Sequence, residues 1–300
     1  MSNPKATKLR ELISSGVFLP MPCCFDALSG KMIEQAGFSL TFMSGFAASA
    51  SRIGAPDLGL MSYGEVVDHA RNITDATSIP LIADGDTGYG NAMNVIRTVS
   101  GLAKAGCAGV LIEDQLAPKR CGHTPGKEVV GREEAFDRIK AAVDARENGD
   151  DILIMARTDA NHTYGLTEAL DRAQKFHDLG ADILFVEAPK NEEEMKQICS
   201  ELPGCKMANI VEGGLTPNIP MSELNEMGYQ IAAYPLTLLS ASMRAMKNAL
   251  ANLRSDTPRD KDILNFSELR DIIGFEEYYE ISSQYETSKR NIVMMKSLLN

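Results

Sequence analysis

The sequence lacks several features that define large protein classes. The apolar run IAAYPLTLLSASM is well below the ~18 residues needed to span a bilayer. Neither GxGxxG nor GxxxxGK[ST] occurs, so no motif favours a nucleotide-binding fold. Basic residues are outnumbered, 30 against 41 acidic ones, and the net charge of −11 argues against duplex nucleic acid or an anionic membrane as partner. This charge is compatible with a local basic pocket for a small anionic metabolite.

Secretion signals and disulfide spacing are also missing. The first residues predict a short amphipathic helix, and the apolar stretch VFLPMPCCF after it is short and holds two prolines. The six cysteines have no framework spacing, and Cys23 and Cys24 are adjacent. We interpret them as free thiols of a cytoplasmic protein.

One local pattern recurs along the chain: a helical stretch, a glycine and then a β-rich run. Glycine suits the left-handed residue that ends a helix, and a run that is apolar on both faces fits a parallel sheet covered by helices. Together with similar runs that lack the glycine, the pattern predicts eight strands. They lie near residues 17–22, 38–43, 81–84, 107–113, 152–157, 181–187, 206–212 and 229–235.

Polar side chains close most of these runs. Such groups at the carboxyl ends of successive parallel strands are typical of the active site of a (β/α)8 barrel. A doubly wound sheet is the competing fold, but it gathers ligands at one switch point rather than around a ring. We therefore expect a TIM-type barrel with an N-terminal helix over residues 1–235. The closing residues are Ser44, Asp84, Glu113, Arg157, Glu187 and Asn209.

Residues 236–300 read mostly as helix, interrupted by the polar stretch SDTPRDKD. This is more helix than one barrel requires. We expect a C-terminal helical extension of the same domain, packed on a neighbouring subunit.

The stretch ADGDTGYG at residues 83–90 predicts a site for a hard cation. Side chains alternate along an extended segment, so Asp84 and Asp86 should lie on one side of it. Glu113, at the end of the next strand, would complete an oxygen-rich site suited to Mg²⁺ or Mn²⁺. The alternative is a turn in which an Asp side chain merely closes the strand.

The segment KRCGHTPGK at residues 119–127 is too rich in Gly and Pro to be helix or core strand. A thiol beside Lys119 and Arg120 should ionise easily, so Cys121 is a candidate functional cysteine on a moving loop. An ordinary exposed loop is the alternative. A zinc site or a hydrolytic pair formed by Cys121 and His123 is disfavoured, because no further ligand pair or orienting partner is evident.

Arg157 has two interpretations that the sequence leaves open. A guanidinium at a strand end is suited to bidentate binding of a substrate carboxylate. It is equally suited to an ion pair with Glu187 or Asp159 that closes the barrel rim.

At these residues the chain resembles the isocitrate lyase/phosphoenolpyruvate mutase superfamily, from about residue 17 to the C-terminal helices. KRCGH is the signature of its lyase branch, and SGFAAS, PDLG, DGDTGYG, IEDQ, ARTDA and VEAP follow in family order. The resemblance implies a Mg²⁺-dependent barrel and a homotetramer that exchanges its C-terminal helices. The implied metal ligands, some acting through water, are Asp57, Asp84, Asp86 and Glu113.

The same resemblance implies roles around the metal. Cys121 would be the general acid on a gating loop, with Lys119 and His123 beside it in the catalytic set. The substrate carboxylate would bind largely to backbone N–H groups at the start of SGF. The implied substrate-binding residues are Ser44, Gly45, Phe46, Asp57, Gly122, Arg157, Glu187, Asn209 and Pro235.

The implied reaction is cleavage of a 2-hydroxy dicarboxylate, which leaves a carbanion that needs a proton. Members that cleave 2-methylisocitrate carry Tyr where this chain has Phe42, and oxaloacetate hydrolases carry Ser where it has Pro235. We therefore favour a C–C lyase for a small 2-methylmalate-type acid, such as 2,3-dimethylmalate, giving pyruvate and propionate. The alternatives are a carboxyphosphonoenolpyruvate phosphonomutase, an oxaloacetate hydrolase, a 2-methylisocitrate lyase and a non-catalytic oxo-acid-binding barrel.

Overall fold

The structure, a computed structural model, describes residues 2–122, 126–258 and 263–285. The chain divides into two compact units, Met1–Ala241 and Ser242–Asn300. Within the described residues, no helix is both long and apolar enough to cross a membrane.

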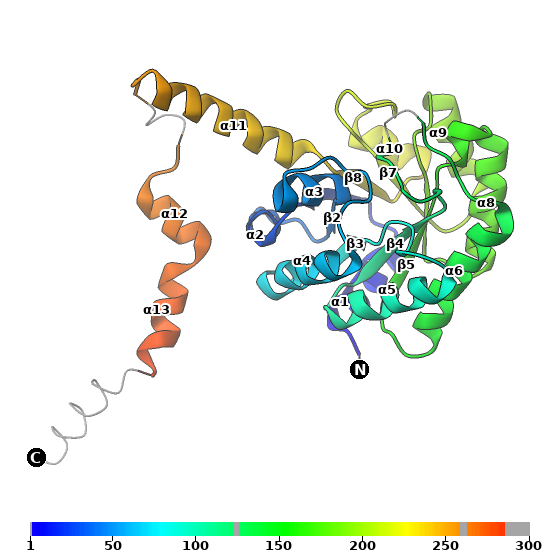
Figure 1. Cartoon of the computed structure of the whole chain (residues 1–300), viewed down its shortest axis with the longest axis horizontal. Helices are drawn as coiled ribbons and strands as arrows, with labels where there is room; N and C mark the ends of the chain where they lie inside the picture. The colour runs from blue at the N-terminus through cyan, green and yellow to red at the C-terminus, as the bar shows by residue number, and fades with distance from the viewer. Residues whose placement is uncertain (1, 123–125, 259–262, 286–300) are drawn as a thin grey trace, which may run out of the picture. The chain divides into compact units, whose positions relative to one another are not determined.

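Eight parallel strands close into a barrel in the first unit, in chain order (Figure 1). The closure is made by the last strand, which pairs with the first so that Ile231 lies opposite Leu19. The expected (β/α)8 barrel is confirmed. The strands are β1 Leu19–Cys24, β2 Thr41–Met43, β3 Leu81–Asp84, β4 Gly109–Glu113, β5 Leu153–Thr158, β6 Ile183–Val186, β7 Cys205–Asn209 and β8 Ile231–Tyr234.

The helices begin and end at residues of the expected kind. Asn3, Ser62 and Asn91 each accept backbone N–H bonds at a helix start. Gly37 and Gly106, each the residue after a helix C-cap, have the positive φ angles of 85° and 87° that glycine tolerates best. The helices of this unit are α1 Pro4–Ser14, α2 Ala27–Gln35, α3 Gly45–Ile53, α4 Tyr63–Ala76, α5 Ala92–Lys104, α6 Arg132–Glu147, α7 Ala160–Thr163, α8 Leu166–Asp178, α9 Glu192–Glu201 and α10 Met221–Met227.

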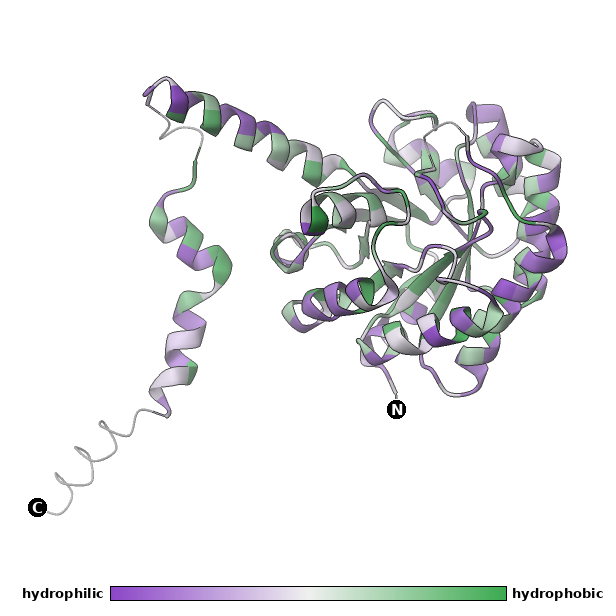
Figure 2. Ribbon diagram, viewed as in Figure 1, coloured by the Kyte–Doolittle hydropathy of each residue, from purple (hydrophilic) through white to green (hydrophobic). Residues whose placement is uncertain are grey.

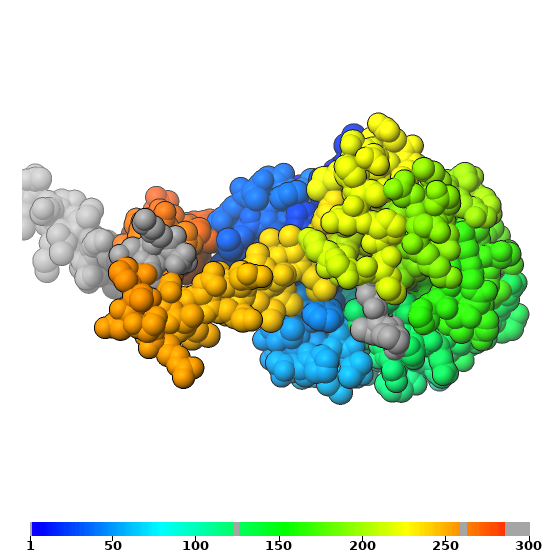
Figure 3. Space-filling view, turned by 90° about the horizontal axis from the view of Figure 1, so that it is seen from above, coloured from blue at the N-terminus to red at the C-terminus, as the bar shows by residue number. Residues whose placement is uncertain are grey.

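Two apolar clusters explain why the strands are hydrophobic on both faces. Figure 2 shows strands in the hydrophobic colour, surrounded by helices that carry both colours. One cluster fills the barrel interior, where Met21, Leu111 and Met155 are fully or almost fully buried. Leu9 of α1 belongs to this inner cluster, so α1 packs against the interior of the barrel. The second cluster lies between the strands and the surrounding helices. Successive segments occupy neighbouring sectors around the barrel, as the colour sequence of Figure 3 shows.

The described residues of the C-terminal region form helices in stretches where the sequence predicts helix. α11 Thr237–Arg254 begins in the first unit, and α12 Phe266–Ile273 and α13 Phe275–Ser283 follow within the second. The described residues of α12 and α13 include none that is buried, and Phe266 and Tyr278 are 74% and 72% exposed.

Candidate active site

The polar residues that close the predicted strands lie at one mouth of the barrel. Asp84, Glu113 and Asn209 are the last residues of β3, β4 and β7, and Arg157 is the last but one of β5. Ser44 and Glu187 directly follow β2 and β6. Because the carboxyl ends of parallel strands share one end of a barrel, these side chains come together as expected.

Ser44, Gly45 and Phe46 form the start of helix α3. The Ser44 side chain caps the helix by accepting the N–H of Ala47, and the N–H of Gly45 donates to Asp84 Oδ2 at 3.2 Å. A Cβ atom on Gly45 would lie 2.5 Å from the same oxygen, so only glycine fits there without displacing Asp84. The unpaired N–H groups and dipole of a helix start favour an anion at this point of the site.

The Asp84–Asp86 segment differs from our expectation. Strand β3 ends at Asp84, and Asp86 has a φ of 50°, so a turn rather than the alternation of an extended strand places its side chain. Asp84 Oδ1 accepts the N–H of Asp86 at 3.0 Å, which is the strand-closing turn considered as the alternative. The turn does not separate the two acids: both line one cavity, together with Asp57.

Lys119 holds these acids together. Its ammonium lies 2.5 Å from Asp57 Oδ1 and 2.7 Å from Asp86 Oδ1, and its side chain is 6% exposed. Burial by itself lowers the pKa of Lys119, but the charges of Asp86, Asp84, Asp57 and Glu113 outweigh it and raise the pKa well above its usual value. Lys119 is therefore a permanent cation directed at the carboxylates.

The acids also suit a hard divalent cation, although no three carboxylate, thiol or imidazole groups in the described part of the chain converge on a single point. Mg²⁺ needs no such cage, because it keeps several waters and takes one or two carboxylates directly. Burial raises the pKa of Asp86 to about 6, because the charged form of a buried carboxylate is energetically unfavourable. Glu113 Oε1 is buried and has no hydrogen-bond partner among the described residues. The donor set therefore fits Mg²⁺ bound partly through water.

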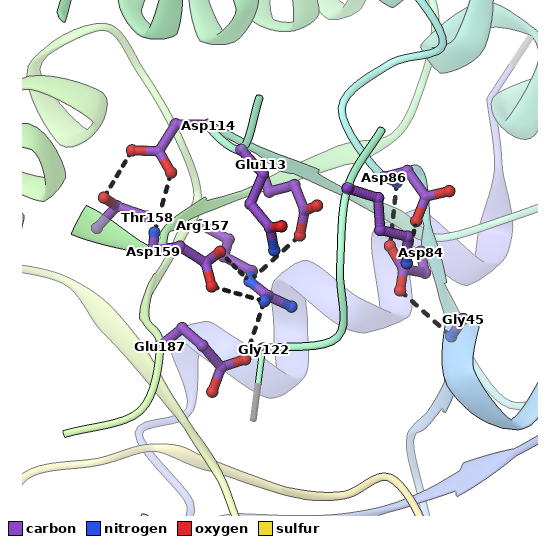
Figure 4. Close-up of polar contacts among 12 residues, drawn as sticks. Gly45, Asp84, Asp86, Glu113, Asp114, Gly122, Arg157, Thr158, Asp159 and Glu187 are labelled. Carbon is purple, nitrogen blue, oxygen red and sulfur yellow. Dashed lines mark hydrogen bonds and ion pairs between the residues drawn. The ribbon is translucent and has the colours of Figure 1, made fainter. Parts of the chain in front are cut away.

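Arg157 is surrounded by acids (Figure 4). Its guanidinium forms a bidentate pair with Asp159, at 2.8 and 3.0 Å, and lies 3.3 Å from Glu113 and 3.2 Å from Glu187. The ion-pair interpretation of Arg157 is thus observed. The same side chain also lines the cavity at the barrel mouth, so the clamp interpretation is compatible with its position.

That cavity brings together the nine residues expected to bind substrate, along with Asp84 and Cys121. Asn209 reaches Glu187 across it, with Nδ2 to Oε2 at 3.3 Å. Asp57, Asp84 and Gly45 line both this cavity and the one beside Asp86, so the two adjoin. The expected residues on its wall are Ser44, Gly45, Phe46, Asp57, Gly122, Arg157, Glu187, Asn209 and Pro235.

Cys121 is half-buried and faces the cavity, whereas Cys23, Cys24, Cys107 and Cys205 are buried in the fold. Glycine at position 122 allows the chain to approach the acids: a Cβ atom there would lie 2.6 Å from Arg157 Nη2 and equally close to Glu187 Cδ. The third member of the expected catalytic set, His123, lies outside the described residues.

Several residues of the site had not been selected from the sequence. Lys127 has no exposed side-chain surface and pairs with Asp159, a residue considered only as a partner of Arg157. An apolar wall formed by Leu111, Phe185 and Met207 was also missed. The alternation of side chains along β4, β6 and β7 could have identified these residues, because every second side chain of a barrel strand faces the barrel axis.

Comparison with known proteins agrees with this geometry. The family model for phosphoenolpyruvate phosphomutase matches residues 9–254. The 2,3-dimethylmalate lyase of Eubacterium barkeri is 44% identical over 95% of this chain and 99% of its own length. An oxaloacetate acetylhydrolase bound to 3,3-difluorooxalacetate superposes with a TM-score of 0.90 at 33% identity, over 94% of this chain and 97% of the other. A phosphonopyruvate hydrolase solved with oxalate and Mg²⁺ gives 0.83 at 29% identity, over 95% and 99%. The chain is therefore an enzyme of the phosphoenolpyruvate mutase/isocitrate lyase superfamily.

Proposed function

We propose that the protein cleaves a carbon–carbon bond in a small 2-methylmalate-type acid, such as 2,3-dimethylmalate, to give pyruvate and a carboxylic acid. The observation that carries this proposal is the make-up of one cavity. It combines the start of α3, the carboxylate cluster and the Cys121 thiol with an apolar wall. The relative named 2,3-dimethylmalate lyase, at 44% identity, supports the same substrate class.

The charges on the cavity wall favour a dicarboxylate over a tricarboxylate. Among the described lining residues Arg157 is the sole cation, and three acids already neutralise it. A third substrate carboxylate would have to be desolvated without a matching cation, which is costly. Methyl groups, in contrast, would gain free energy by burial against Phe42, Phe185 and Met207.

The chain's own groups have distinct tasks in this reaction. The start of α3 binds and orients one carboxylate of the substrate, and Arg157 orients the other. Mg²⁺, held by Asp57, Asp84, Asp86 and Glu113, would supply Lewis-acid stabilisation of the negative charge that develops on the C2 oxygen. As the C2–C3 bond breaks, the C2 hydroxyl gives its proton to solvent and becomes the carbonyl of pyruvate. The bonding electrons remain on C3 as a carbanion beside a carboxylate, and Cys121 Sγ–H donates the proton that this carbon requires.

A panel of acids assayed with Mg²⁺ tests the proposal. Pyruvate release is followed with lactate dehydrogenase, and the panel contains 2-methylmalate derivatives, 2-methylisocitrate, oxaloacetate and phosphonopyruvate. We expect turnover of at least one 2-methylmalate derivative. Oxalate formed from oxaloacetate, or phosphonate rearrangement seen by phosphorus NMR, without cleavage of any malate would contradict the proposal.

Substitution of the proposed acid gives a second test. Cys121→Ser should reduce turnover by about 10²-fold or more, because the serine hydroxyl is a much weaker acid, while oxalate binding with Mg²⁺ is kept. Cys199→Ser is the matched control, since Cys199 is the other half-buried thiol and does not line the cavity. Equal rates for the two variants would remove Cys121 from the mechanism.

We also propose that the enzyme is a cytoplasmic homotetramer in which the C-terminal helices cover a second subunit. The free cysteines are compatible with a reducing compartment. The exposed apolar side chains of α11 to α13, among them Met246, Leu250 and Phe266, support burial against another copy. Light scattering of the purified protein measures the mass directly, and a monomer would contradict the assembly.

A further inference from the structure

Lys127 is a buried ammonium to which the reaction assigns no task. Its side chain has no exposed surface, and Nζ lies 3.0 Å from Asp159 Oδ1. The same nitrogen donates to the backbone carbonyl of Gly122. A buried ammonium is costly unless charged and polar partners satisfy it, and here these partners come from two different segments of the site.

Asp159 connects Lys127 to the cavity. Its Oδ1 accepts from both Lys127 and Arg157, its Oδ2 accepts from Arg157, and its own N–H donates to Asp114 at 2.9 Å. Burial alone would raise the pKa of Asp159, but the charges and hydrogen bonds of Arg157 and Lys127 lower it. The carboxylate is therefore a fixed anion between two cations.

Gly122 is held from two sides by this arrangement. On one side its α-carbon packs so closely on Arg157 and Glu187 that a Cβ atom would overlap both side chains. On the other side Lys127 binds its carbonyl oxygen. The residue before it is Cys121, whose side chain lines the cavity.

We infer that Lys127 is a positioning residue: it holds the backbone at Gly122 against the Arg157–Glu187 pair and thereby sets where the Cys121 thiol stands over the cavity. The inference deepens the proposed function, because it names the residue that positions the proton donor Cys121. Its expected effect on turnover rests on that proposed function. Its structural part, the position of a thiol, can be measured without any substrate.

The test is the rate at which iodoacetamide alkylates Cys121, followed by peptide mass spectrometry in Lys127→Met and in the wild type. Measuring over about pH 6 to 10 separates the thiol pKa from the limiting rate, which reports the exposure of the thiol. We expect the limiting rate at Cys121 to change by about tenfold or more in Lys127→Met, because a lost hydrogen bond to a charged group shifts a local equilibrium by at least about that factor. Cys199 in the same molecule serves as the reference.

Lys206→Met is the matched control. Lys206 is also a buried lysine that donates to backbone carbonyls, those of Leu202 and Gly204, but it lies at the start of β7, at the opposite end of that strand from Asn209. Its substitution should leave the alkylation of Cys121 unchanged. An unchanged limiting rate at Cys121 in Lys127→Met, or a change of equal size at Cys199, overturns the inference.

Asp159→Asn tests the same link if Lys127→Met does not fold. It keeps the size of the side chain and weakens the hold on Lys127, so the alkylation of Cys121 should change in the same direction, and no change overturns the inference. With a 2-methylmalate derivative, Lys127→Met should lower kcat by about tenfold or more while KM stays within about threefold. If the wild type cleaves no malate, the proposed function fails, whereas the alkylation result still decides the position of Cys121.

Discussion

A single added methyl group at Gly122 tests the closest packing in the site. In Gly122→Ala the new Cβ would lie 2.6 Å from both Arg157 Nη2 and Glu187 Cδ. Ordinary van der Waals separation is about 3.5 Å, so either the chain or the ion pair must move by about 1 Å. The backbone at this glycine does not have a positive φ, so crowding alone accounts for the effect.

The size of the effect follows from what moves. Arg157 and Glu187 have side chains that are 10% and 0% exposed, and their pair distance is 3.2 Å. Overpacking in such surroundings costs about 1–3 kcal/mol of stability. A displacement of about 1 Å in a catalytic site can lower turnover by about 10²-fold. We therefore expect Gly122→Ala to lose about 10²-fold in turnover while it remains folded.

The assay combines urea unfolding with turnover of a 2-methylmalate derivative in the presence of Mg²⁺. Gly64→Ala is the matched control: a Cβ atom there meets only Ser62 Oγ, at 4.0 Å, and the position lies in helix α4. Alanine at position 64 should leave activity unchanged and raise stability by about 0.5–1 kcal/mol. If Gly122→Ala matches the wild type in both measurements, the close approach of Gly122 to the ion pair is refuted.

Two further predictions concern charge. Lys119→Met should lower the free energy of unfolding in the absence of Mg²⁺ by about 3–5 kcal/mol, since it leaves buried carboxylates unpaired. The control Lys140→Met removes an exposed ion pair and should change the free energy of unfolding by less than about 1 kcal/mol. Equal losses of stability in the two variants would show that the ion pairs of Lys119 do not stabilise the fold. Burial lowers the pKa of His69 from 6.5, and nearby Arg52 adds to this, so the unfolded state binds a proton first as the pH falls. The stability due to neutral His69 is complete above pH 6.5 and is lost below it. His69→Gln should therefore flatten the fall of Tm with decreasing pH, and a slope equal to that of the wild type would contradict this.

The barrel could be predicted because its determinants are local. A parallel strand covered on both faces is a short apolar run, and the glycine that follows several of the helices has its own conformational requirement, as at Gly106 and Gly180. The polar residues at the strand ends followed from the same pattern. Once the barrel is accepted, its topology brings Asp84, Glu113 and Arg157 to one mouth without further information.

Contacts between distant segments could not be predicted in the same way. Nothing near Lys127 in the sequence indicates that its ammonium reaches Asp159, because the contact depends on how one loop folds across the end of β5. The turn at Asp86 shows a related limit. An extended segment and a tight turn both place two acids near each other, and only the backbone angles distinguish them.

The ammonium of Lys119 gives the carboxylate cluster an internal cation. A metal ion that binds to the cluster must share Asp57 and Asp86 with the Lys119 ammonium. The free energy measured for binding any metal is then a difference: the interaction of the acids with the metal ion minus the interaction with Lys119 that they lose. Ions that bind through their own water molecules disturb that charge least, so the cluster discriminates by hydration as well as by size.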